Sequence, residues 1–426
     1  MPANRRPLIK LRIFIPATLF VLLLFFAVNL FRIESERRIL KEDLIELSKV
    51  KYGLFNVDEW KRILSVIISK KIEELNLQGS DREAMRKKIS SLLYKIVGDF
   101  EKRYRDENSG SIKGFLRGGL ASFLGIFENV KRDVPKFTEQ ILNFMNEPAN
   151  RKAVRSFILQ KLNDYADKTF SKADYQTHDR IILTHGHSDR IKTIEYLSKE
   201  IESLTERAAF YKLLLLIVAA AVAVFILASK QLSQLEYFML TIITLILLLP
   251  GLLIPMIEID ARIASMRFNL LGEPVVFHDQ VLYYKSKSIL EVVQLMLEQG
   301  RTDLLFVGFL VFAFSVLFPI AKLISSLLYI QFARLRGNRF IRFMIFKTGK
   351  WSMADVMVIA IFMAYIGFSG IITEQLKQIE SITATMEILT TNKSSLLTGF
   401  FSFTAFAILS LLVSHKLQYQ REPLSR

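Results

Sequence analysis

The feature that most constrains this chain is a set of six apolar stretches, each long enough to cross a lipid bilayer. The hydrocarbon core of a bilayer is about 30 Å thick, and a helix needs about 20 apolar residues to cross it. The sequence therefore predicts an all-α polytopic membrane protein with six transmembrane helices. The six stretches are residues 13–31, 208–228, 237–257, 304–330, 357–372 and 395–414.

The N-terminus has the features of an anchor rather than of a secretory signal. Four basic residues, Arg5, Arg6, Lys10 and Arg12, precede the first apolar stretch. That stretch is longer than the apolar core of a signal peptide, and no small-x-small cleavage site follows it. We therefore expect residues 1–32 to form an uncleaved transmembrane anchor whose N-terminus lies in the cytoplasm.

The loop charges predict the orientation of the remaining helices. The loop after the fourth stretch carries Arg334, Arg336, Arg339, Arg342, Lys347 and Lys350 with no acidic residue among them. Loops rich in Lys and Arg stay in the cytoplasm. Six crossings then place both termini in the cytoplasm and residues 33–207 outside, and residues 208–426 form a membrane domain of five helices.

The extracytoplasmic domain between the first and second helices is expected to be helical. Its apolar residues recur at helical rather than strand spacing. Ser80 and Glu83 have the spacing of a capping box, which predicts a helix ending near 108–110. A coiled-coil-like stripe then runs without a breaker into residues 208–228, which predicts one long helix that acts as a stalk. The stripe consists of Ile191, Ile194, Leu197, Ile201 and Leu204.

One turn in this domain resembles the first metal motif of metallo-β-lactamase-fold hydrolases. His185, His187 and Asp189 form a His-x-His-x-Asp pattern, and imidazoles that alternate along a strand can converge on a metal. The next ligand of that family is absent because Arg190 stands in its place, and helices follow instead of an αββα chain. We therefore expect a structural turn, no metal site and no enzyme.

The composition restricts the partners. The net charge of +16 favours anionic partners, and anionic lipid headgroups are the first candidates for a membrane protein. Nucleic acid is not expected, because no RNA- or DNA-binding motif accompanies the charge. The chain has no cysteine, so it has neither disulfides nor thiolate metal sites, and nothing predicts a cofactor.

The third apolar stretch contains two prolines, Pro250 and Pro255. Each proline removes a backbone donor and frees a carbonyl one turn earlier, and in a bilayer such groups must be satisfied by protein or water. A simple kink is the alternative. Glu258, Asp260 and Arg262 follow at the outer end of the helix, where the last two can form an ion pair.

The external segment after this stretch carries two further signals. Residues 274–284 alternate apolar and polar side chains, which is a weak strand signal. Residues 288–298 form an amphipathic helix that ends at Gly300 and is expected to lie along the membrane interface.

The fourth stretch contains the most informative charge, Lys322, with Pro319 one turn and Ser315 two turns before it. A lysine in a membrane helix costs about 2.5–3.5 kcal/mol at the helix centre, so it usually faces a cavity or a partner. Snorkelling of the ammonium to the headgroups is the equally weighted alternative.

The fifth helix is preceded by Ser352 and Asp355, which have the spacing of a capping box. Asp355 therefore has two interpretations, a helix cap and a polar residue on a transport path, and both can hold at once.

The C-terminal half resembles the paraquat-inducible protein A family over about residues 237–416. The resemblance rests on four segments and on their order and spacing. They are Pro250-Gly-Leu-Leu-Ile-Pro-Met256, residues 288–300, Phe318-Pro-Ile-Ala-Lys-Leu323 and Gly349-Lys-Trp-Ser-Met-Ala-Asp-Val356. Many members carry two such modules and Cys-rich zinc ribbons, whereas this chain has one module and no cysteine.

The resemblance implies a bacterial inner-membrane component of a lipid transport system. Such a component loads or extracts phospholipid for a periplasmic mammalian-cell-entry domain partner, with possible coupling to protons. A membrane scaffold without transport activity is the alternative. The residues expected along a polar path are Lys322, Asp355, Ser315, Pro319, Ser352, Glu258, Pro250 and Pro255.

Overall fold

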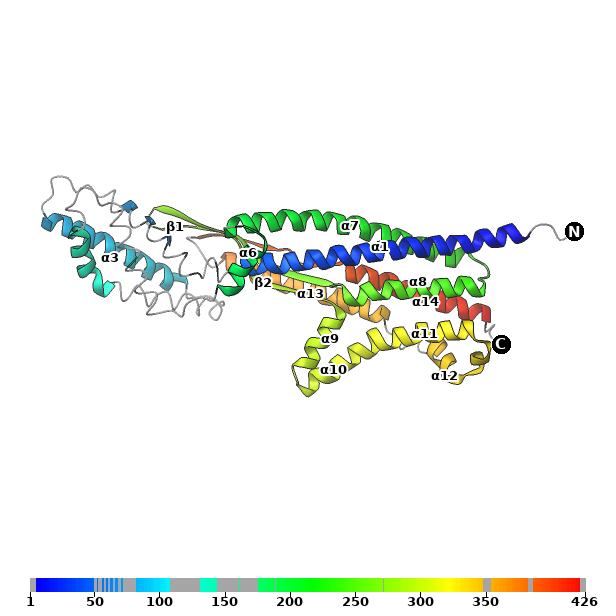
Figure 1. Cartoon of the computed structure of the whole chain (residues 1–426). Coiled ribbons are helices and arrows are strands. Elements are labelled where there is room, and N and C mark those ends of the chain that lie inside the picture. The colour runs from blue at the N-terminus through cyan, green and yellow to red at the C-terminus, as the bar shows by residue number, and fades with distance from the viewer. Residues whose placement is uncertain are drawn as a thin grey trace.

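The computed structural model shows an elongated molecule in which both chain termini lie at one end and α3 (Arg82–Glu107) lies at the other (Figure 1). The structure describes residues 5–49, 82–107, 131–143, 175–187, 189–270, 272–347, 354–381 and 386–421, with isolated positions between 52 and 71 and at 160. The side chains of residues 5–13 and 96–107 and of a few positions elsewhere lie outside this description, as do Gly349 to Met353 entirely.

Two long helices, α1 (Arg5–Leu47) and α7 (Arg190–Ala228), run side by side along the molecule (Figure 1). Both are longer than a bilayer crossing requires, so they continue past the apolar segment as a two-helix stalk. The stripe expected on α7 is confirmed where Leu197 and Ile201 pack with Leu44 and Leu47 of α1. The sequence predicts the stripe, but it does not reveal that α1 is the helix against which the stripe packs.

The outer end of α1 is fastened to the start of α7 and to α6 (Gln176–Thr184). The guanidinium of Arg190 donates to the carbonyl of Leu47 at 2.9 Å and to that of Tyr52 at 3.1 Å. The first bond pairs a carbonyl that the end of α1 leaves unpaired, and the second holds the segment that follows the helix. The helix predicted from Ser80 and Glu83 is present as α3, and the proposed division of the chain into domains stays a prediction.

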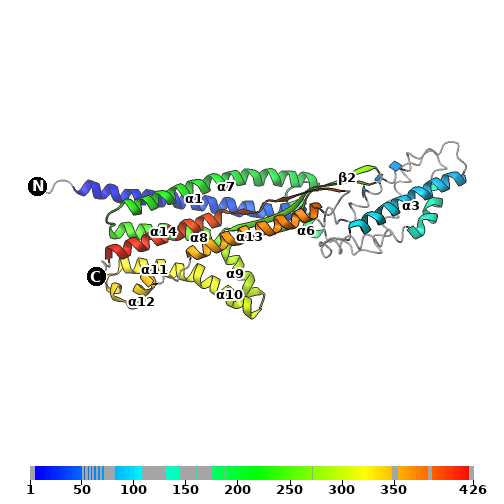
Figure 2. The same ribbon diagram turned by 180° about the vertical axis from the view of Figure 1, so that it is seen from behind.

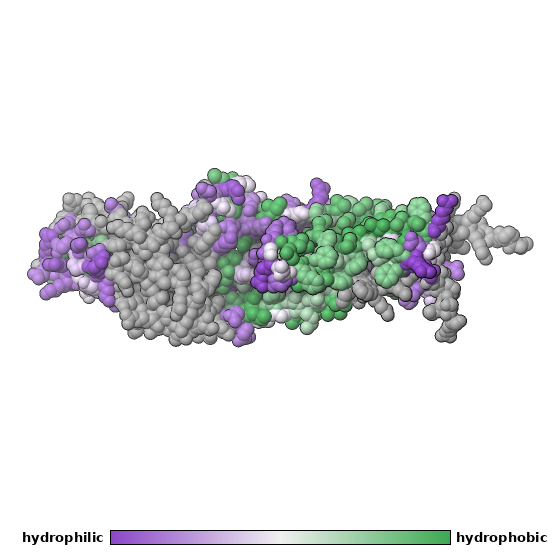
Figure 3. All heavy atoms as spheres, turned by 90° about the horizontal axis from the view of Figure 1, so that it is seen from below, coloured by the Kyte–Doolittle hydropathy of each residue, from purple (hydrophilic) through white to green (hydrophobic). Residues whose placement is uncertain are grey.

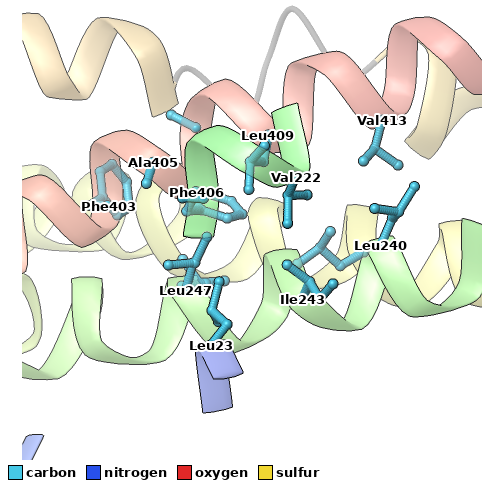
Figure 4. Close-up of a cluster of buried hydrophobic side chains, with 14 of the residues drawn as sticks. Leu23, Val222, Leu240, Ile243, Leu247, Phe403, Ala405, Phe406, Leu409 and Val413 are labelled. Atoms are coloured by element: carbon cyan, nitrogen blue, oxygen red, sulfur yellow. The ribbon is translucent and has the colours of Figure 1, made fainter. Parts of the chain in front are cut away.

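The membrane core is built from α1, α7, α8 (Gln234–Leu253) and α14 (Thr398–Arg421). Residues 229–233 turn the chain back sharply, and Ser233 and Glu236 cap α8 with a reciprocal capping box. Figure 4 shows apolar side chains from these four helices interlocking in one cluster. The labelled members are Leu23, Val222, Leu240, Ile243, Leu247, Phe403, Ala405, Phe406, Leu409 and Val413.

A small antiparallel sheet lies between the membrane helices and the outer end of the molecule. Strands β1 (Ile257–Leu270) and β2 (Glu273–Lys287) form a long hairpin, and Gly272 turns with a φ of +86°. Strand β3 (Met386–Asn392) and the short β4 (Ser395–Leu396) pair with the other edge of β1. The weak strand signal at residues 274–284 is confirmed, and the rest of the sheet goes beyond the all-α expectation.

The chain between the sheet and the fifth crossing forms a bent arm. Helix α9 (Ile289–Glu298) is capped by Ser288 and Glu291, ends before Gly300 as predicted, and packs on α10 (Thr302–Phe312). A π-helix, η2 (Ala313–Leu317), joins α10 to α11 (Phe318–Gln331). The basic loop forms η3 (Ala333–Gly337), α12 (Arg339–Arg342) and η4 (Phe343–Lys347).

Helix α13 (Ala354–Ser381) is the most exposed of the crossings and lies on the face that is turned towards the viewer in Figure 2. Only 6% of its most apolar window is buried, against 61% for α8. Helix α8 therefore belongs to the core, whereas most of α13 is free to face lipid.

The helices confirm the central expectation from the sequence. Six helices in the described part of the chain are long and apolar enough to cross a membrane, at the six places that the apolar stretches indicate. Figure 3 shows apolar surface covering much of the helical part, with hydrophilic surface at its ends. The chain is therefore a multi-pass helical membrane protein.

Candidate functional site

Lys322 lies inside the membrane domain and not at its surface. Its side chain is 2% exposed, and its ammonium donates to the hydroxyl of Ser410 on α14 at 3.1 Å. Ser326, one turn further along α11, donates to the main-chain carbonyl of Lys322 at 2.9 Å. The snorkelling alternative is therefore wrong for this structure, because the ammonium points to a neighbouring helix.

The backbone before Lys322 departs from α-helical geometry. Residues 313–317 form a π-helix, and the amide of Phe318 donates to the carbonyl of Ala313. Pro319 follows directly and has no amide hydrogen to offer the carbonyl of Ser315. Ser315 and Pro319 are both buried. π-Helical turns are frequent at functional sites because they change which side chains share a face.

The two prolines of the third crossing have different roles. Pro250 lies inside α8 and is buried, whereas Pro255 stands in the break between α8 and β1. The amide of Ile254 donates to the carbonyl of Pro250 at 2.9 Å, and the amide of Gly399 donates to that of Pro255 at 3.1 Å. Protein amides therefore pair with the carbonyls of both prolines.

Glycines let α8 and α14 approach closely at this break. A Cβ atom on Gly399 would lie 2.2 Å from the carbonyl oxygen of Ile254, and one on Gly251 would lie 2.9 Å from Cα of Phe403. Neither space admits a methyl group. The crossing of α8 and α14 is therefore fixed by backbone contact.

Glu258 belongs to a buried charge cluster outside the apolar part of the bundle. Its carboxylate lies 3.4 Å from the ammonium of Lys41 on α1, and it accepts from the hydroxyl of Tyr284 at 3.2 Å. Asp260, which is 0% exposed, lies 3.4 Å from the same ammonium. Arg262 donates to both oxygens of Asp260, at 2.6 and 2.8 Å, so the pair expected from the sequence is confirmed.

A second part of the cluster joins α1 to α14. Glu34 accepts from the guanidinium of Arg37 at 2.8 Å and from the hydroxyl of Thr398. All three side chains are buried. With Lys41, Arg262, Glu258 and Asp260, the largely buried part of the cluster contains three cations and three carboxylates, and Arg262 also reaches the partly exposed Asp279 at 3.4 Å.

The cluster shifts the ionisation of its members. Burial raises the pKa of Asp260, but hydrogen bonds and charges from Arg262 and Lys41 outweigh it and hold this pKa below the ordinary value of 3.8. Burial, followed by the charge of Glu258, raises the pKa of Tyr284 far above 10.0, and Arg37 opposes this in part. Asp260 is therefore ionised and Tyr284 is neutral at physiological pH.

The structure separates the predicted polar residues into two groups. Ser315, Pro319 and Lys322 lie together along η2 and α11, while Glu258 lies in the sheet with α1. Asp355 is in the first turn of α13, and its side chain lies outside the described residues, as does Ser352. The capping box between these two residues therefore stays a prediction.

Several residues of these sites were not singled out from the sequence. Ser410 is one of two buried serines of α14, and Ser402 is the other; no side chain among the described residues is hydrogen-bonded to the hydroxyl of Ser402. Serines eight residues apart in an apolar stretch are the signal that could have indicated a polar face. Lys41 and Glu34 gave no such signal, because charged residues are ordinary outside a membrane helix.

The histidine turn has structural contacts. His185 ends α6, and its Nε2 lies 2.9 Å from a carboxylate oxygen of Asp43 on α1. The ring of His187 packs against Tyr196 with centroids 5.1 Å apart. In the part of the chain that the structure describes, no group of three or more His, Cys, Asp or Glu residues is arranged to hold a metal.

The fold and this site define a class: a multi-pass helical membrane protein with a lysine buried inside its C-terminal helices. The family model of Paraquat-inducible protein A matches residues 274–421, which confirms the resemblance and its location in the C-terminal half. The match covers only the C-terminal part of the chain. It begins in β2, so the proline-broken α8 precedes it. Comparison with curated proteins finds no match, and comparison with solved structures finds none.

Proposed function

We propose that this protein is the inner-membrane component of a lipid transport system. In this proposal it loads or extracts phospholipid for a periplasmic partner of the mammalian-cell-entry type, with both of its termini in the cytoplasm. The observation that carries the proposal is the burial of Lys322 between α11 and α14, at 2% exposure. The family match is compatible with this role.

A buried ammonium argues for more than anchoring. Its insertion into a membrane helix costs about 2.5–3.5 kcal/mol at the helix centre, and a pure anchor gains nothing in return. The same helix contains a π-helical turn and Pro319, and α14 contributes Ser410. These features give the interior polar groups that a phosphate headgroup can bind.

Asp355 and Lys322 both lie towards the basic loop on their helices, α13 and α11. Helix α13 packs on η2, and Ile361 joins the core cluster that contains Val316. Asp355 lies six residues before Ile361 and Lys322 six residues after Val316, and both helices run towards the basic loop in that direction. Six residues correspond to about 9 Å of helical rise in each case.

This placement supports a mechanism of exchange. The ammonium of Lys322 holds the anionic headgroup, and a carboxylate changes its protonation as the headgroup enters or leaves. Asp355 is the first candidate for the proton because, like Lys322, it lies towards the basic loop on a helix that packs against η2 or follows it. Glu258 is the second, although its carboxylate is already held by Lys41 and Tyr284.

The alternative function is a membrane scaffold, and one observation favours it. The apolar side chains of α1, α7, α8 and α14 interlock closely (Figure 4), as expected of a rigid anchor for the stalk. Transport would then have to use the side of the bundle formed by α11, α13 and α14. We propose no covalent catalysis, and the contact of His185 with Asp43 supports a structural turn.

Photolabelling tests the proposal. The full chain is reconstituted with a phospholipid that carries a photoreactive group next to its phosphate, and the labelled residues are mapped. Labelling of α11 and α14 around Lys322 and Ser410 is the expected result. Labelling confined to outward-facing residues such as Phe309 and Ile359 would contradict lipid transport and favour the scaffold function.

A further inference from the structure

The sequence of the loop between α11 and α13 is rich in basic residues and contains no acidic residue. Residues 332–350 contain six Arg and Lys residues and no Asp or Glu. The described part of this loop, 332–347, folds into η3, α12 and η4 at the end of the bundle that also holds both chain termini (Figure 1). The loop is therefore a folded, cationic surface at one end of the membrane domain.

The loop has an inner face that fixes it to the bundle. Ile341 and Ile345, one helical turn apart, are buried in the same core cluster as Leu323 and Leu417. Asn338 caps the short α12 by accepting from the amide of Phe340 at 2.9 Å. This orientation decides which side chains of the loop point away from the protein.

The outer face combines aromatic and cationic side chains. Phe332, Phe340 and Phe343 are 53%, 64% and 45% exposed. Three exposed arginines lie beside them in the chain: Arg334, Arg339 and Arg342. On the turn from Arg339 to Phe343, residues three and four apart are neighbours, so Arg339 lies next to Phe343 and next to Arg342.

We propose that this outer face binds anionic phospholipid headgroups of the adjoining leaflet. Phenylalanine at the end of a membrane bundle can bury its ring at the acyl boundary, and an arginine beside it reaches the phosphate level. A guanidinium also matches the geometry of a phosphate better than an ammonium does. The uniform positive charge selects an anionic lipid over a zwitterionic one.

A lipid surface suits this face better than a soluble acidic protein. Phe332 directly follows α11, whose outward residue Ile324 is also exposed, so the aromatic face continues the surface that meets lipid. A membrane therefore already covers the neighbouring residues. The proposal concerns the end of the bundle and does not depend on lipid transport through it.

Spin-labelled lipids test the proposal. The full chain is reconstituted in phosphatidylcholine bilayers that contain a trace of spin-labelled phosphatidylglycerol or phosphatidylcholine, and the immobilised fraction of each label is measured. The test variant carries Arg334→Gln, Arg339→Gln and Arg342→Gln. A control variant carries Lys192→Gln, Lys199→Gln and Arg207→Gln, which removes the same charge from exposed positions on the stalk.

The expected result is that the unmodified chain and the stalk variant prefer phosphatidylglycerol to phosphatidylcholine, and that both do so to the same extent. The loop variant should lose roughly fivefold or more of that preference. A second variant, Phe340→Ser with Phe343→Ser, keeps the charge and should also weaken the preference. The proposal would be overturned if the loop variant kept its preference for phosphatidylglycerol and unfolded at the same temperature as the control. The outer face would then be a candidate binding surface for a protein partner.

Discussion

The ammonium of Lys41 lies 3.4 Å from a carboxylate oxygen of Asp260, which joins the first helix to the hairpin that follows the third. The two residues are 219 positions apart in the chain, since 260 − 41 = 219. Asp260 is completely buried and is held from its other side by Arg262. A buried ion-pair contact therefore joins α1 to the hairpin.

We expect Asp260→Asn to destabilise the protein strongly. The change leaves Lys41 and Arg262 without their shared carboxylate, and breaking a buried ion pair typically costs about 3–5 kcal/mol. The free energy of unfolding in detergent micelles measures the loss. Asp303→Asn, at an exposed pair with Arg301, is the matched control and should leave the free energy of unfolding almost unchanged, because water screens exposed ion pairs. Equal losses for the two variants would show that the cluster does not hold the domains together.

The same carboxylate predicts the response to acid. The pKa of Asp260 is lower in the folded protein than its ordinary value of 3.8, so its contribution to stability is complete above that value. It is lost as the pH falls below 3.8 and through the lowered pKa of the folded state. The thermal midpoint should fall below pH 4 in the unmodified chain. In the Asp260→Asn variant it should already be low at pH 7 and fall less between pH 7 and pH 3.

The membrane helices and the stalk could be predicted because each leaves a local signal. Apolar length indicated the six crossings, and a periodic stripe on residues 191–204 indicated the long α7. The sheet was largely missed, because its pairs join residues far apart, such as Arg262 and Thr391. Strand β1 also follows a membrane helix directly, and its Glu258 and Asp260 point inwards to Lys41 of α1.

The contact of α8 with α14 predicts that Gly399→Ala is destabilising. The new methyl group would lie 2.2 Å from the carbonyl oxygen of Ile254, so the helices must separate. Overpacking of this kind costs about 1–3 kcal/mol, and more where backbone atoms are involved. Gly367→Ala is the control, because nothing lies within 4 Å of its Cβ position on α13. The control should be unchanged or up to about 1 kcal/mol more stable, as alanine favours a helix.

Replacement of Pro319 should separate transport from stability. In Pro319→Ala the new amide can donate to the carbonyl of Ser315, which favours a regular α-helix over the π-helical turn. We expect lipid transfer to fall severalfold, because the polar side chains of this helix would no longer face the lipid headgroup in the same way. A loss of this size corresponds to roughly one hydrogen bond. The unfolding free energy should stay the same or rise. A variant that transfers lipid at the normal rate would show that the π-helix is dispensable.

The site was only partly predictable for a related reason. Lys322 was indicated because a charge in an apolar stretch is rare, and Pro319 because a proline breaks a helix. The choice between a buried and a snorkelling lysine required the position of α14, and the sequence does not reveal which helix faces Ser410. Lys41 and Glu34 acquire their role only from the packing of α1 against the sheet and α14.

The most direct test is lipid transfer by Lys322→Met in proteoliposomes that contain the periplasmic partner. Methionine keeps most of the volume, so the fold should persist, while the lost charged hydrogen bond of about 1.5–3 kcal/mol should slow transfer roughly 10-fold to 100-fold. Lys377→Met, at an exposed position on α13, is the control and should transfer lipid at the unmodified rate. Full transfer by a folded Lys322→Met protein would contradict the proposed function.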